Sequence, residues 1–127
     1  PMGMTAHLVY DAIDPLPATL SKRMMEVIRE DIGFDNLIMT DDISMKALTG
    51  GLGGLSRDAI AAGCDVILHC NGTLAERAEV AQAAGEMTDA AQRRALRALS
   101  YRQKPDDIDI SALDAQLKVL MGEGLHG

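Results

Sequence analysis

The sequence predicts an α/β fold, because short apolar runs alternate along the chain with segments that have helical periodicity. Strands separated by single helices pair in parallel through right-handed crossovers. One of the apolar runs, Leu37–Asp42, ends abruptly in two adjacent carboxylates. Three strand–helix units are too few to close an eight-stranded barrel, which needs about 200 residues. We therefore expect the 127 residues to be a piece of a larger protein rather than a self-contained three-stranded domain.

Three strands are predicted from the apolar runs. They are Met2–Val9, Leu37–Thr40 and Val66–Cys70. The segment between the first strand and the first helix, Asp11–Thr19, contains Pro15 and Pro17 and is predicted to be a loop. The third strand is nearly all apolar, which is typical of a strand buried on both faces.

Helices are predicted where apolar residues recur at helical spacing after a capping residue. The predicted helices run from Ser21 to Asp31, from Ser56 to Ala62, from Thr73 to about Glu86, from Thr88 to Tyr101 and from Ser111 to Met121. Thr73 and Glu76 form a capping-box pattern. Gly33 and Gly63 stand where a helix would end. Ile43–Leu48 is expected to form a helix or turn, and the glycine-rich stretch Thr49–Leu55 a surface loop.

The chain is predicted to divide into residues 1–87, which carry the strands, and residues 88–127, which carry two further helices. We expect these helices to cover the outside of the strand-bearing part. Their predicted apolar contacts are Leu96, Leu99, Leu113, Leu117 and Leu120.

The composition excludes several classes of protein. A net charge of −7 argues against a nucleic-acid partner, because phosphates would be repelled, and an aromatic share of 2% leaves few surfaces for stacking bases. Cys64 and Cys70 are expected to be reduced, mostly buried thiols. No apolar run approaches the roughly 18 residues of a membrane span, and no signal-peptide pattern is seen. A cytoplasmic location is therefore expected.

The two carboxylates at the end of the second strand are the candidate chemistry. In α/β proteins, reactive groups lie just beyond the carboxyl ends of the strands. An acid held rigidly there could attack a substrate or stabilise a developing positive charge. From position alone, Asp41 could equally be a solvated loop acid. Asp42 is expected to be an N-cap or structural acceptor for the following helix.

Four stretches of the sequence together resemble a known family. They are Met4–His7 followed by Asp14–Thr19, Gly33–Phe34, Thr40–Met45, and Ala62–Asp65 followed by Leu68–Asn71. In order and spacing they resemble the C-terminal half of the catalytic barrel of family 3 glycoside hydrolases, within it the bacterial β-N-acetylhexosaminidases that recycle cell-wall muropeptides. The resemblance implies about three βα units, strands six to eight, of a (β/α)8 TIM-type barrel, followed by extra C-terminal helices.

The resemblance also implies a mechanism. Asp41 matches the family's nucleophile, which forms a covalent glycosyl-aspartate while a terminal β-linked N-acetylglucosamine is removed with retention. Asp42 stands where related β-glucosidases have Trp, which favours the hexosaminidase branch. The family's acid/base pair and sugar-binding residues lie early in the barrel and are not found in residues 1–127. The chain alone is therefore expected to be inactive without the N-terminal half, and the mechanism requires no cofactor or metal.

Two roles are possible for each of the other residues near these motifs. His7 and Met45 are candidates for substrate binding, but a hydrogen-bonded structural histidine and a core methionine explain them equally well. His69 is expected to be structural. Two further functions stay open for the chain: a non-catalytic α/β interaction module, and a metal-dependent hydrolase that uses Asp41 and Asp42 as ligands.

Overall fold

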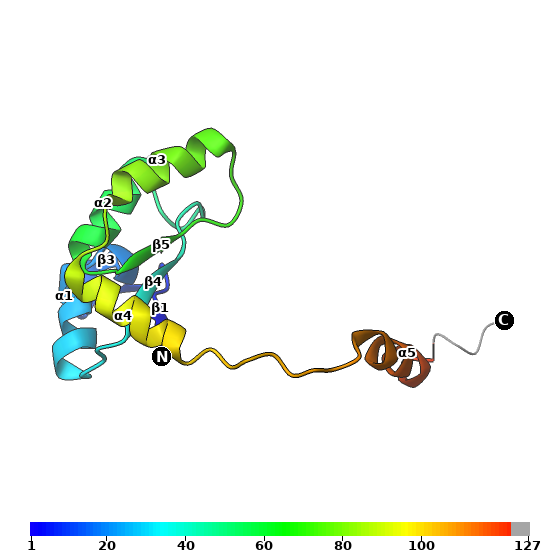
Figure 1. Ribbon diagram of the computed structural model, residues 1–127. Helices are drawn as coiled ribbons and strands as arrows, with labels where there is room; N and C mark the ends of the chain where they lie inside the picture. The colour runs from blue at the N-terminus through cyan, green and yellow to red at the C-terminus, as the bar shows by residue number, and fades with distance from the viewer. Residues whose placement is uncertain (123–127) are drawn as a thin grey trace.

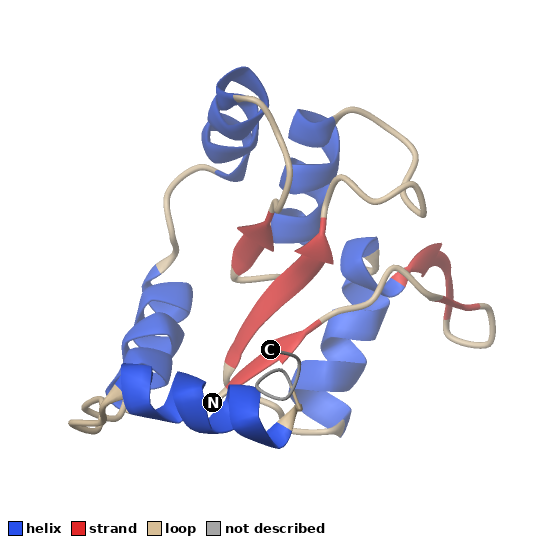
Figure 2. Cartoon of the chain, turned by 90° about the vertical axis from the view of Figure 1, so that its right-hand side faces the viewer, coloured by secondary structure: helices blue, strands red, loops and turns tan. Residues whose placement is uncertain are grey.

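A three-stranded parallel sheet forms the centre of the molecule (Figures 1 and 2). The computed structural model describes residues 1–122. The strands are β1 (Met2–Met4), β4 (Leu37–Asp42) and β5 (Val66–Leu68), in the order β1-β4-β5. Met2 lies opposite Leu37, and Met39 lies opposite Val66. The predicted α/β class with parallel strands is confirmed.

The first strand is shorter than predicted. It ends at Met4, and the chain then forms a two-stranded antiparallel ribbon of β2 (Val9–Tyr10) and β3 (Asp14–Pro17). The prediction that Asp11–Thr19 is only a loop is therefore wrong. Prolines are tolerated in β3 because both strands of a two-stranded ribbon are edge strands, where a missing N–H need not remove a hydrogen bond.

The connection from β3 to β4 is helical as far as Asp31, and residues 32–36 form a short loop before β4. A short 3-10 helix, η1 (Ala18–Leu20), leads into α1 (Lys22–Glu26), which continues as a π-helical turn, η2 (Val27–Asp31). Ser21 caps α1 as predicted, since its hydroxyl accepts a hydrogen bond of 2.9 Å from the backbone N–H of Met24. Gly33 has a φ of 74°, the left-handed conformation that the predicted helix stop requires.

The glycine-rich stretch is helical from Leu52 onward, so the prediction of a surface loop for Thr49–Leu55 is wrong in its second half. Helix α2 (Leu52–Ala62) packs against α3 (Leu74–Ala84). Gly53 lies in this contact, and its N–H donates to Glu79 Oε1 at 2.8 Å. A Cβ at position 53 would lie 2.8 Å from the same oxygen, so a larger residue there would require the Glu79 side chain to move.

Two further helices follow the sheet. The capping box of Thr73 and Glu76 is present on α3. Thr88 caps α4 (Asp89–Ser100), which packs against β4. Helix α5 (Ile110–Leu120) is capped by Asp109, so the predicted cap at Ser111 is wrong.

The predicted leucine contacts of the last two helices are absent within the described chain. All five are exposed, by 48% to 83%, and the residue of α4 that is buried is Ala91. Helix α5 stands apart from the sheet in Figure 1, and every residue from 101 to 121 is exposed. Its packing on a barrel surface stays a prediction, as does the domain boundary at residue 87.

The core lies between the sheet and helices α1, α2 and α3. Its buried members are Met25, Ile38, Ile43, Leu48, Leu55, Ala59, Ala62, Cys64 and Val80. Both cysteines are free thiols, as predicted, but only Cys64 is buried. Cys70 is exposed because β5 ends at Leu68, two residues before the predicted end.

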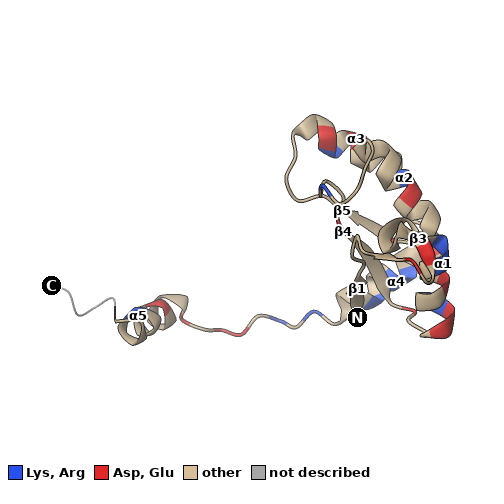
Figure 3. Ribbon diagram, turned by 180° about the vertical axis from the view of Figure 1, so that it is seen from behind, with Lys and Arg blue, Asp and Glu red and all other residues tan. Residues whose placement is uncertain are grey.

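A charged network joins the segments at the amino ends of β4 and β5. Asp65 Oδ2 accepts hydrogen bonds from Arg29 Nη2 at 2.7 Å and from the N–H of Ile38 at 2.8 Å. Its other oxygen accepts from Arg94 Nη1 at 3.0 Å. Arg94 also pairs with Asp35 at 2.8 Å. Acidic and basic residues lie interspersed around α1 in Figure 3, where Arg23 pairs with Glu26 at 3.3 Å.

Candidate active site at the carboxyl ends of the strands

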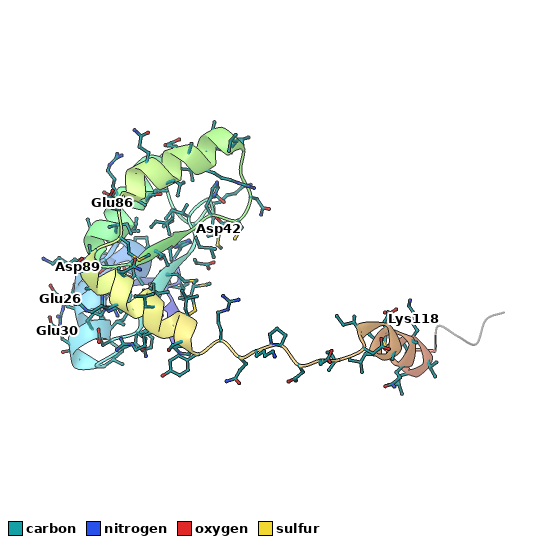
Figure 4. All side chains as sticks on the ribbon, in the orientation of Figure 1. Glu26, Glu30, Asp42, Glu86, Asp89 and Lys118 are labelled. Carbon is teal, nitrogen blue, oxygen red and sulfur yellow. The ribbon has the colours of Figure 1, made fainter. Side chains whose placement is uncertain are left out.

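Strand β4 carries both candidate carboxylates at its carboxyl end. It runs two residues beyond the predicted end at Thr40 and includes Asp41 and Asp42. Figure 4 shows Asp42 at the opposite end of the sheet from Glu26, Glu30 and Asp89. The carboxylates therefore occupy the end at which parallel α/β folds place their chemistry.

An irregularity in the sheet lies beside these residues. Met39 is opposite Val66, but Asp42 is opposite Leu68, so β4 contains one more residue than β5 over this interval. The hydroxyl of Thr40 accepts a hydrogen bond of 2.9 Å from the N–H of Leu68 and replaces part of the normal ladder. Bulges of this kind change the direction of side chains and are frequent next to active sites.

The Asp41 carboxylate is held at one oxygen. Its Oδ1 accepts a hydrogen bond of 2.8 Å from the N–H of Asp42, and the residue is half-buried. Among residues 1–122, this is the only hydrogen bond of the carboxylate. The other oxygen has no hydrogen-bond partner among the same residues.

Asp42 connects the segments around the site. Its Oδ1 accepts from the N–H of Ser44 at 3.1 Å, the Ser44 hydroxyl at 2.8 Å and the N–H of Cys70 at 3.3 Å. Burial raises the pKa of Asp42, but the hydrogen bonds from Ser44 and Cys70, with a smaller contribution from the neighbouring His69 side chain, outweigh burial and hold the pKa below its ordinary value. Asp42 therefore accepts from a turn, and no helix follows it directly as the predicted cap would require. Its role in the site stays a prediction.

His7 is tied into the same framework. Its buried ring places Nε2 2.9 Å from the backbone oxygen of Asp42 and Nδ1 2.8 Å from the Thr19 hydroxyl. Because a carbonyl oxygen only accepts, Nε2 must carry the proton. Both ring nitrogens are therefore engaged within the protein, which favours the hydrogen-bonded structural histidine over direct sugar binding.

Met45 lies in the turn that follows β4. Its N–H donates to the backbone oxygen of Asp42 at 3.0 Å, and the residue is 44% exposed. The alternative interpretation of a core methionine is therefore wrong. Contact between Met45 and a bound sugar stays a prediction.

His69 lies beside Asp42, although only a structural role is predicted for it from the sequence. Its Nδ1 lies 3.6 Å from Asp42 Oδ1, and its side chain is 5% exposed. Neither ring nitrogen has a hydrogen-bond partner among the described residues. One signal in the sequence points to it: His69 lies near the end of the third predicted strand as Asp41 lies at the end of the second, and neighbouring parallel strands end at the same edge.

The described residues lend no support to a metal-dependent hydrolase. No group of three or more His, Cys, Asp or Glu side chains in residues 1–122 is arranged to hold a metal ion. Over the same residues, each helix is too short or too polar to cross a bilayer.

Comparison with known proteins shows the family of the chain. The model of the "Glycosyl hydrolase family 3 N terminal domain" matches residues 2–99, more than half of the chain. The chain belongs to glycosyl hydrolase family 3. The predicted family resemblance is confirmed.

Relatives and solved structures agree with this membership. A beta-hexosaminidase of Alkalilimnicola ehrlichii is 46% identical over 74 residues, which are 56% of this chain and 21% of the relative. One of Shewanella frigidimarina is 44% identical over 71 residues, 54% of this chain and 21% of the relative. The chain therefore spans about a fifth of the length of these curated relatives.

Two solved structures are also similar to the chain in sequence and fold. The beta-N-acetylglucosaminidase from Thermotoga maritima has 28% identity and a TM-score of 0.63, over 82% of this chain and 26% of that one. NagZ from Neisseria gonorrhoeae has 27% identity and a TM-score of 0.58, over 92% of this chain and 32% of that one.

Proposed function

We propose that this chain is the part of a retaining β-N-acetylhexosaminidase that carries the nucleophile, Asp41. The observation that supports it most is the placement of Asp41 at the end of β4 in a family 3 glycosyl hydrolase, with one oxygen held and the other without a protein partner. Relatives that match this part of the chain are named beta-hexosaminidases. The substrate class is a terminal β-linked N-acetylglucosamine of a muropeptide or chito-oligosaccharide, cleaved in peptidoglycan recycling.

In this mechanism Asp41 attacks the anomeric carbon as the glycosidic bond breaks, through an oxocarbenium-like transition state. The hydrogen bond from the N–H of Asp42 orients the carboxylate and favours its ionised form. Ser44, Cys70 and His7 fix Asp42, so the backbone that donates to Asp41 is itself held. Water then hydrolyses the glycosyl-aspartate and releases the sugar.

The remaining catalytic groups belong to barrel strands outside this chain in our proposal. The sheet has an open edge at β1 and another at β5, and three strands cannot close a barrel. The exposure of Met2 (47%) and Met4 (56%) on β1 fits a neighbouring strand at that edge. In the proposal, the acid/base residue and most of the sugar-binding residues lie on the N-terminal strands of the barrel.

The decisive experiment replaces the nucleophile in the natural protein that contains this chain. Asp41→Asn should lower kcat on an aryl N-acetyl-β-glucosaminide by about a thousandfold or more, because the covalent step is lost. Asp58→Asn, at an exposed acid on α2, is the matched control and should keep wild-type kcat. A fluorinated N-acetylglucosaminide should label Asp41. Full activity of Asp41→Asn, or a label on another residue, would contradict the proposal.

A further inference from the structure

His69 is the one buried ionisable side chain at the carboxyl end of the described sheet whose polar atoms have no hydrogen-bond partner in residues 1–122. Buried polar groups nearly always find such a partner, so an exception in a native fold calls for an explanation. Apolar packing alone does not explain an imidazole at this place, because a leucine would fill the space without burying two unpaired nitrogens.

The ring is confined between two elements. On one side, Nδ1 lies 3.6 Å from Asp42 Oδ1, within ion-pair distance but just beyond a hydrogen bond. On the other side, the segment before α3 approaches so closely that a Cβ at Gly72 would lie 2.2 Å from Nε2. Gly72 thus leaves the imidazole room in a position directed at Asp42.

Asp42 can accept the additional donor. Its Oδ1 is already bonded to Ser44 and Cys70, but no hydrogen bond to its Oδ2 is made within the described residues. The N–H of the same residue donates to Asp41 Oδ1 at 2.8 Å. A change in the position of the Asp42 carboxylate can therefore change the position of the Asp41 carboxylate, because the Asp42 backbone N–H is bonded to Asp41.

We propose that His69 is a positioning residue for the nucleophile: its Nδ1–H donates to the Asp42 carboxylate when the sugar is bound. A shift of less than 1 Å from the observed separation brings the two groups to hydrogen-bond distance. The bond then fixes Asp42, and through its N–H fixes Asp41 below the sugar ring. This inference rests on the proposed role of Asp41 as nucleophile.

The test compares His69→Leu with His69→Asn in the natural protein that contains this chain. His69→Leu should lower kcat about tenfold with KM nearly unchanged, because only the alignment of the nucleophile is lost. Its Tm should stay the same or rise, since an apolar side chain replaces a buried ring without partners. His69→Asn should recover part of kcat, because its amide N–H₂ can donate from near the position of Nδ1.

A second variant tests the same contact from the other side. Gly72→Ala should push the imidazole away from its position and lower kcat in the same way as His69→Leu. Adding Gly72→Ala to His69→Leu should then lower kcat little further, because both changes remove one interaction.

Three results would overturn the inference. They are an unchanged kcat in His69→Leu, a fall in kcat matched by a fall in Tm, and a kcat that His69→Asn does not improve over His69→Leu. Asp41→Asn separates this inference from the proposed function. If Asp41→Asn is inactive and His69→Leu fully active, only the inference about His69 fails. If Asp41→Asn is active, the nucleophile assignment itself fails.

Discussion

The two ends of the central strands are held in different ways. At the amino ends, the Asp65 carboxylate is bonded to Arg29, Arg94 and the N–H of Ile38, and its side chain is only 4% exposed. At the carboxyl ends, Asp41 has one hydrogen bond and His69 has none among the described residues. The same strands thus begin in a fully bonded charge network and end at a site where Asp42 and His7 are bonded but His69 and one oxygen of Asp41 have no partner among the described residues.

This difference separates stability from chemistry. A buried carboxylate whose partners are all present joins its segments and has no capacity left for a ligand. A carboxylate with a free oxygen contributes less to the fold but can react. Proteins with parallel strands commonly divide the two tasks in this way, with the amino ends serving stability and the carboxyl ends serving catalysis.

The largest expected difference between the two ends is in the alkylation rates of their cysteines. Cys64 precedes β5, and burial raises the pKa of its thiol to about 12, whereas Cys70 follows β5 and is exposed. Because the thiolate is the nucleophile, Cys64 in the folded protein should react with iodoacetamide at pH 8 about a thousandfold more slowly than an ordinary thiol. Peptide mass mapping after timed alkylation measures both rates. In urea the two rates should become similar, and equal rates in the native protein would contradict this account of the two ends.

The next effect is on stability at the amino ends. Asp65→Asn leaves Arg29 and Arg94 facing a neutral side chain and should lower the free energy of unfolding by about 3 kcal/mol, the lower end for a buried pair. The lower end applies because the arginine side chains are 16% and 21% exposed. Urea denaturation of the protein measures the change. Asp58→Asn should change the same quantity by less than about 0.5 kcal/mol, and an equal loss in both variants would show that Asp65 has no special role.

The smallest effect concerns the exposed part of the same network. The hydrogen bond from Arg94 holds the pKa of Asp35 below its ordinary value of 3.8. A carboxyl whose pKa is lower in the folded state contributes stability that is fully present above its unfolded pKa and is lost as the pH falls through its folded pKa. Asp35→Asn should therefore reduce stability near neutral pH slightly and flatten the decline below about pH 4. Urea midpoints measured from pH 2 to 7 would show it, and parallel curves for the two proteins would contradict it.

Most of the fold could be predicted from local patterns. The caps at Ser21, Thr73 and Thr88 and the stop at Gly33 were predicted because each depends on a few neighbouring residues. The start of α2 could not be predicted, because Gly53 is fixed by its contact with Glu79, which is 26 residues away in the sequence. The ribbon of β2 and β3 was missed because two prolines normally argue against a strand.

The candidate site also has some features that local sequence predicts and others that depend on distant contacts. Asp41 and Asp42 could be located from the sequence, since an apolar strand that ends in acids predicts where they lie in an α/β fold. The roles of His7 and His69 could not. Whether a histidine is fully hydrogen-bonded or left without partners depends on which distant groups surround it, here Thr19 and Asp42 for His7, and Asp42 and Gly72 for His69.

The three parallel strands, most of the helices and the position of the acidic pair were predicted from the sequence alone, because periodicity, caps and strand ends are local properties. The family was predicted from the resemblance of four short stretches. The tertiary structure decided which polar atoms are satisfied. Hydrogen bonds between segments far apart in the chain exist only once the sheet has brought those segments together, so the bonding of Asp65 and the unpaired ring of His69 appear only in the folded molecule.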